Sequence, residues 1–137
     1  MSLVLDASVA LSWCLDEVQS AETLVVLQAL ETMPAFVPAI FPLEIANTLI
    51  VSERRKRVTP KRMARFVDDM RKLPFHVDAT VIDLALGPVL DLARKHNMTA
   101  YDASYLELAL RLRAPLATID DGLLQAALSA GVGIFGT

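Results

Sequence analysis

Short apolar segments alternate with longer helical segments along this chain, and an acidic residue stands at four of their junctions. The apolar runs 2–5, 35–39, 75–77 and 115–119 have the length and composition of buried strands. Strands that alternate with helices predict an α/β fold with a mostly parallel sheet. In such a sheet the carboxyl ends of the strands share one edge, where ligands bind. We therefore expect the four acids to face one crevice.

Each of these acids also has a purely structural explanation. Asp6 and Asp120 follow strands and can cap the next helix. Glu44 lies in the first turn of a helix, where its charge suits the helix dipole. Asp102 follows Thr99 at the spacing of a capping box. The four together are stronger evidence than any one, because metal ligands must gather at the carboxyl edge of the sheet whereas helix caps need not.

Four carboxylates in one crevice require a cation. Two unit charges about 4 Å apart repel by ~4 kcal/mol at an effective dielectric of ~20. Oxygen-only ligand sets suit magnesium or manganese. The sequence therefore predicts an Mg²⁺ or Mn²⁺ site, with catalytic and metal-binding roles for one set of acids: Asp6, Glu44, Asp102 and Asp120. Their polar neighbours are expected to support that site by hydrogen bonding to carboxylates or metal-bound water: Ser8, Asn47, Thr118 and Asp121.

The remaining pattern fits one domain over residues 1–137. Helices are expected over 7–15, 21–32, from 42 to near 58, and over 60–72, 80–96, 99–113 and 122–130, with 132–135 as a final edge strand. Hydrophobic residues make up 54% of the chain, which suits a sheet covered on both faces. Without a transmembrane-length apolar run or an export signal, the chain is expected to be soluble and cytoplasmic. Cys14 is interpreted as a core residue, and His76 and His96 as structural.

The basic residues are concentrated in one window. Residues 54–72 hold nine of the thirteen lysines and arginines and two acids, although the whole chain carries a net charge of −3. A positive patch of this kind could grip a phosphate backbone or dock an acidic partner, and a solvated helix pair is an equally open explanation. RNA or partner contact is predicted for the first six basic residues: Arg54, Arg55, Lys56, Arg57, Lys61 and Arg62.

Four segments resemble, in order and spacing, the motifs of PIN-domain ribonucleases, and most closely VapC-type toxins of bacterial toxin–antitoxin pairs. They are residues 4–9 (VLDASV), 42–47 (PLEIAN), 101–105 (YDASY) and 116–120 (LATID). The resemblance spans nearly the whole chain. It implies a three-layer α/β/α sandwich around a mostly parallel sheet of four to five strands.

The resemblance also implies an activity and partners. Asp6, Glu44, Asp102 and Asp120 take the metal-site positions of the family, with Asn47 and Thr118 in supporting places. The implied activity is an Mg²⁺- or Mn²⁺-dependent endoribonuclease that hydrolyses RNA by metal-activated water. The implied partners are a cognate antitoxin, an RNA substrate such as transfer RNA, and a second copy in a homodimer. The number of metal ions, and whether Asp121 assists or replaces Asp120, stay open.

Three other classes of protein share part of this pattern. A receiver-type phosphoacceptor domain needs a lysine near its last strands, but lysines here stop at Lys95. A haloacid-dehalogenase phosphatase needs Asp-x-Asp after the first strand, where this chain has Asp6-Ala7-Ser8. The third is a non-catalytic PIN-like module for binding or assembly, in which the acids only cap helices. A stabilising response to manganese would distinguish the enzyme from this module.

Overall fold

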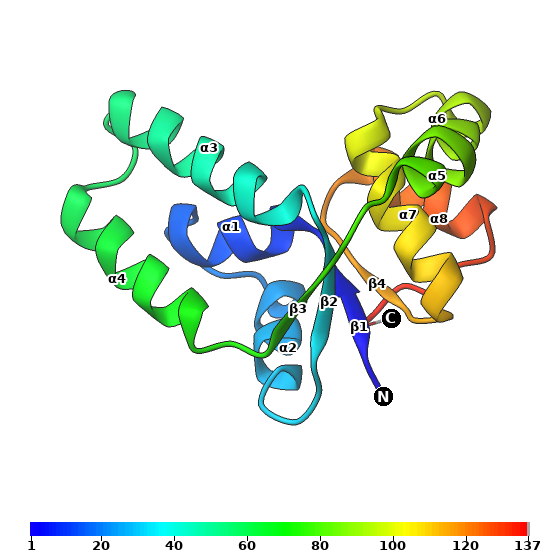
Figure 1. Ribbon diagram of the computed structural model, residues 1–137. Coiled ribbons are helices and arrows are strands. Elements are labelled where there is room, and N and C mark those ends of the chain that lie inside the picture. Colours follow the sequence, from blue (N-terminus) through cyan, green and yellow to red (C-terminus); the bar gives the residue numbers. More distant parts are fainter. Residues whose placement is uncertain (137) are drawn as a thin grey trace.

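A four-stranded parallel sheet forms the centre of the molecule in the computed structural model, which describes residues 1–136 (Figure 1). The strands are β1 (Leu3–Leu5), β2 (Ala35–Pro38), β3 (Phe75–Asp78) and β4 (Leu116–Ala117), and their order across the sheet is β3-β2-β1-β4. All three strand pairs are parallel. The four strands predicted from apolar runs are therefore confirmed.

Helices cover both faces of the sheet, which gives the expected three-layer sandwich (Figure 1). One layer contains α1 (Ala7–Leu15), α2 (Ala21–Ala29), α3 (Phe41–Arg54) and α4 (Pro60–Arg71). The other contains α5 (Ile82–Leu84), the π-helical turn η1 (Ala85–Val89), α6 (Leu90–His96), α7 (Ala100–Leu112) and α8 (Asp121–Ser129). The α3–α4 hairpin extends away from the sheet, on the left in Figure 1. None of the helices that the structure describes is long and apolar enough to cross a membrane.

Several helices begin where capping residues predict it. The side chains of Ser20, Thr59 and Thr99 accept hydrogen bonds from backbone N–H groups in the first turns of α2, α4 and α7. Pro60 occupies the first position of α4, where its missing N–H has no consequence. The predicted end of α3 near residue 58 was four residues too late, because the chain leaves the helix at Arg55 and Lys56 takes a left-handed conformation with φ 57°.

Two other expected elements differ from the structure. The helix predicted over 80–96 starts at Ile82 and widens into the π-helical turn over Ala85–Val89, which contains Pro88. Proline lacks an N–H and clashes with the carbonyl four residues earlier, so a wider turn accommodates it without ending the helix. The edge strand predicted over 132–135 is reduced to one parallel bridge between Leu116 and Ile134.

The sheet order creates the position at which a ligand site is expected. The chain runs from β1 outward to β2 and β3, and then crosses to β4 on the other side of β1. Ligands of open parallel sheets bind outside the carboxyl ends of the strands at such a reversal point. Leu3, Val4 and Leu5 of β1 are all fully buried, so the first residue after β1 leaves the core directly at this point. That residue is Asp6.

Candidate metal centre

Asp6 is fixed at the reversal point by groups from α1, from β4 and from the residue after β4. Its backbone N–H donates to the Ala117 carbonyl at 2.9 Å. Its Oδ2 atom accepts hydrogen bonds from the Ser8 hydroxyl at 2.5 Å and from the Thr118 hydroxyl at 2.8 Å. Asp6 occupies the N-cap position of α1, but its side chain makes no capping hydrogen bond. The helix-cap explanation for this carboxylate is therefore wrong.

The environment of Asp6 opposes its negative charge. The side chain is only 6% exposed, and this burial raises its pKa above the ordinary value, with smaller contributions in the same direction from Asp102 and Asp120. The hydrogen bonds from Ser8 and Thr118 lower the pKa and offset part of that effect. The protein thus keeps a carboxylate in a position where its charge is unfavourable without a nearby cation.

Glu44 belongs to the same group of acids. It lies in the first turn of α3, and its Oε1 atom accepts a hydrogen bond of 2.6 Å from the hydroxyl of Tyr105 in α7. Burial raises the pKa of Glu44, the bond from Tyr105 lowers it, and the charges of Asp6 and Asp102 raise it further. Asp6 and Asp102 therefore lie near enough to Glu44 for their charges to affect its pKa.

Asp102 and Asp120 face a more open part of the same site. Both line a crevice of about 500 Å³ together with a short loop and the start of α8. Burial raises the pKa of Asp102, and Asp120 is the next largest cause. Asp120 also caps α8, because its Oδ2 atom accepts from the Leu123 N–H at 3.3 Å. Thr99 accepts from the Asp102 N–H at 3.1 Å, so the capping threonine expected from the sequence is present.

The four supporting residues have different surroundings. Ser8 and Thr118 contact Asp6 directly, and the Thr118 hydroxyl also accepts from the Asp120 N–H at 3.0 Å. Asn47 is exposed on α3, and its side chain makes no hydrogen bond to any residue in the range 1–136. Asp121 is the exposed first residue of α8. The polar network is therefore centred on Asp6, Ser8 and Thr118.

The chemistry of these residues fits a hard divalent cation held in part by water. The carboxylate and hydroxyl groups offer only oxygen atoms as ligands. The negative charges of neighbouring acids contribute to the raised pKa of Asp6, Glu44 and Asp102. In the described part of the chain, no three His, Cys, Asp or Glu side chains are grouped so that they could hold a metal ion by themselves. Magnesium commonly keeps several waters and binds through one or two carboxylates plus substrate phosphates. The arrangement therefore matches an ion shared with water and substrate better than a preformed protein cage.

Two residues near the acids were not expected from the sequence. Tyr105 is the last residue of the motif 101–105, and the sequence pattern predicts no role for it. In the structure it is fully buried and hydrogen-bonded to Glu44. His96 ends α6 as expected for a dipole partner, but it also lines the crevice of Asp102 and Asp120. The only available signal for Tyr105 was a hydroxyl on an otherwise apolar face of its helix. Nothing in the sequence around His96 predicted its position.

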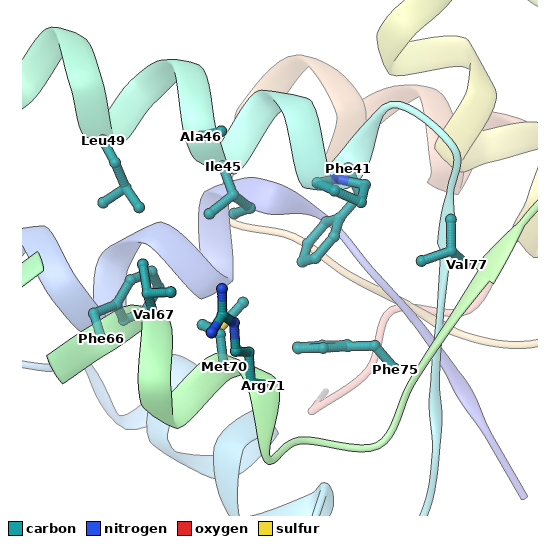
Figure 2. A pocket seen from close by; sticks show the side chains of 11 residues that line it. Phe41, Ile45, Ala46, Leu49, Phe66, Val67, Met70, Arg71, Phe75 and Val77 are labelled. Carbon is teal, nitrogen blue, oxygen red and sulfur yellow. The ribbon is translucent and has the colours of Figure 1, made fainter. Parts of the chain in front are cut away.

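A separate apolar groove lies between α3, α4 and the edge strand β3 (Figure 2). It has a volume of about 390 Å³, and Figure 2 shows side chains from the three elements around it, among them Ile45, Val67 and Phe75. The rings of Phe41 and Phe75 lie 5.3 Å apart at its end near the sheet. Arg71 also lines it.

The basic window lies on the same hairpin as this groove, with most of its residues toward the α3–α4 turn. All six basic residues predicted to make contacts are exposed, and they lie at the end of α3, in the α3–α4 turn and at the start of α4. Arg62 is partly engaged within the protein, because its Nε–H donates to the Cys14 carbonyl at 2.7 Å. Residues 54–57 and 61 carry no ion pair among the described residues. The α3–α4 hairpin therefore combines an apolar groove with unpaired positive charge.

Comparison with known structures identifies the same fold elsewhere. PAE2754 from Pyrobaculum aerophilum is 24% identical, with 92% of this chain and 87% of that chain covered at a TM-score of 0.68. FitAcB from Neisseria gonorrhoeae is 18% identical, with coverage of 99% and 97% and a TM-score of 0.65. A toxin–antitoxin complex from Klebsiella pneumoniae is 18% identical, with 86% of each chain covered and a TM-score of 0.53. No family model and no curated protein matches the chain.

The raised pKa of Asp102 predicts a stability gain on neutralisation. At pH values above 3.8, the ordinary pKa of an aspartate, Asp102 binds a proton more readily in the folded state than in the unfolded state. The free energy of unfolding therefore falls as the pH rises through the raised pKa. In metal-free buffer at pH 8, Asp102→Asn should therefore melt above the parent, by about 4 °C for each 1 kcal/mol. The gain should disappear on acidification to about pH 3, below both pKa values.

Asp69→Asn provides the matched control, since Asp69 is an exposed acid on α4, outside the crevice. Its melting temperature should follow that of the parent at both pH values. Thermal unfolding followed by circular dichroism measures all three proteins. If Asp102→Asn melts below the parent at pH 8 without metal, the Asp102 charge is not made unfavourable by burial and by Asp120.

Proposed function

We propose that this chain is a metal-dependent endoribonuclease and the toxin of a toxin–antitoxin pair. The observation that carries the proposal is the buried Asp6 carboxylate, held by two hydroxyls at the reversal point of the sheet beside Glu44 and Asp102. The resemblance of four motifs to VapC-type toxins gives the substrate class. The shared fold with a toxin–antitoxin complex from Klebsiella pneumoniae is compatible with that assignment.

Each acid has a distinct part in this proposal. Asp6 supplies a fixed carboxylate, because Ser8 and Thr118 restrain its Oδ2 atom. Glu44 supplies a second carboxylate from α3, and Asp102 of α7 lines the open crevice through which a phosphodiester would enter. Bound Mg²⁺ or Mn²⁺ would supply an activated water and neutralise charge on the leaving oxygen. The Ser8 hydroxyl donates a hydrogen bond to Asp6, so its role is to orient the Asp6 carboxylate and not to attack the substrate as a nucleophile.

The partner is proposed to bind the α3–α4 hairpin. A phosphate backbone would use the positive charge of this hairpin but not its apolar groove. A protein segment with apolar side chains on one face and acidic residues on the other would use both. We therefore assign the groove lined by Ile45, Val67 and Phe75 to an acidic antitoxin segment. The antitoxin itself is expected as the product of a short reading frame beside this gene.

Cleavage of RNA tests the catalytic part of the proposal. With Mn²⁺ present, the parent should cut total RNA, and Asp102→Asn should reduce the rate by at least about 100-fold, because the cation that would stabilise transition-state charge loses a carboxylate ligand. Asp69→Asn removes the same charge from α4 and should retain the parent rate. Gel analysis of total RNA with mapping of the new ends measures both the activity and the cleavage position.

The result also distinguishes the enzyme from a non-catalytic binding module. Asp102→Asn protein that is folded and cleaves at the parent rate would remove Asp102 from the mechanism. A parent protein that neither cleaves RNA nor gains thermal stability with millimolar Mn²⁺ would favour the module, because binding to the native state alone must stabilise it.

Charge insertion into the groove tests the partner assignment. Val67 of α4 lines the groove, so Val67→Lys should abolish co-purification with the co-expressed antitoxin by placing a charge among apolar contacts. The same substitution adds positive charge to the hairpin, so RNA cleavage should not decrease. Val25→Lys is the matched control, because Val25 is 45% exposed on α2. Undiminished co-purification of Val67→Lys would rule out docking in this groove.

A further inference from the structure

The hydrogen bond between Tyr105 and Glu44 joins two helices on opposite faces of the sheet. Tyr105 is fully buried in α7, and its hydroxyl donates to Glu44 Oε1 at 2.6 Å across 61 residues of sequence. Within residues 1–136, the Glu44 side chain makes no other hydrogen bond. Tyr105 therefore ties Glu44 of α3 to α7.

A simpler explanation is that Glu44 merely satisfies a buried hydroxyl. Buried tyrosine hydroxyls do require a partner, but a neutral amide or carbonyl would serve. A glutamate also carries a second oxygen, Oε2, which makes no hydrogen bond within residues 1–136. That oxygen is open to a further partner.

The properties of Tyr105 suit a permanent donor. Its hydroxyl lies 2.6 Å from Glu44 Oε1, and because an ionised carboxylate can only accept, the hydroxyl is the donor of this bond. The ring packs within the core while the hydroxyl reaches the acid. A glutamate side chain has three rotatable bonds, so without a partner its carboxylate can take many orientations. A hydrogen bond to one oxygen restricts the directions in which the second oxygen can point.

We propose that Tyr105 is a positioning residue that holds Glu44 Oε1 so that the other carboxylate oxygen is presented to a divalent cation. The inference rests on the proposed metal-dependent function. Partners that orient metal ligands typically contribute 10–100-fold to metal affinity. Tyr105 acts only through Glu44 and contacts neither the cation nor the RNA.

Binding of Mn²⁺ to the RNA-free protein tests this role without an activity assay. The electron paramagnetic resonance signal of free Mn²⁺ gives the dissociation constant at a temperature where each variant is folded. Tyr105→Phe removes one oxygen atom and should raise that constant by about 10-fold or more. Tyr101→Phe is the matched control on the same helix, since Tyr101 is 61% exposed, and it should bind Mn²⁺ as the parent does.

A double-mutant cycle separates positioning from a general effect on the fold. In the Glu44→Ala background, Tyr105→Phe should have no further effect on Mn²⁺ affinity, because its route of action is gone. An equal loss in both backgrounds would overturn the proposal, as would parent-like affinity of Tyr105→Phe. If Tyr105→Phe does not fold, Glu44→Asp shortens the acid away from the hydroxyl. Its Mn²⁺ affinity should fall about 10-fold, and parent-like affinity would overturn the proposal.

Failure of this inference is distinguishable from failure of the proposed function. A parent protein that binds no Mn²⁺ overturns both. If the parent binds Mn²⁺ and the Tyr105→Phe protein binds it with equal affinity, only the positioning role of Tyr105 is overturned. The proposed metal site is then unaffected.

Discussion

The arrangement of the site follows from one unfavourable interaction, the burial of the Asp6 carboxylate next to other acids. The core strand β1 ends just before this residue, and the sheet order places β4 beside it, so the side chain has little contact with bulk water. Two hydroxyls compensate in part, since they lower a pKa that burial raises. Burial also raises the pKa of Glu44 and Asp102, so their charges are unfavourable too. In the proposed function, a divalent cation would compensate the remaining negative charge.

The two charged regions of the molecule have opposite signs and serve different parts of the proposed function. The crevice at the sheet edge is acidic and would repel a phosphate backbone in the absence of metal. The α3–α4 hairpin is basic and borders an apolar groove. A bound cation would therefore be needed for RNA to approach the acids, whereas an acidic protein segment could bind the hairpin with or without metal. Inhibition and catalysis would then use separate surfaces of one small fold.

Much of the fold could be predicted from local pattern. Apolar runs and helix caps give correct strands at β1 to β4 and correct starts for α2, α4 and α7, because these signals act within a few residues. The parallel topology then brings Asp6, Glu44 and Asp102 together without any further information. Features that depend on distant packing could not be predicted. The Tyr105–Glu44 bond joins residues 61 apart, and the π-helical turn at Pro88 depends on the helix continuing beyond a proline. The sequence also gave no sign that the Asn47 side chain would be exposed.

Anomalous diffraction from a crystal grown with Mn²⁺ would locate a bound ion without reference to activity. We expect a strong anomalous peak at the carboxyl edge of the sheet, bonded to Asp6 and to at least one of Glu44 and Asp102, with water completing the coordination. A crystal saturated with Mn²⁺ that shows no peak there, or peaks only at surface acids elsewhere, would contradict the proposed metal site.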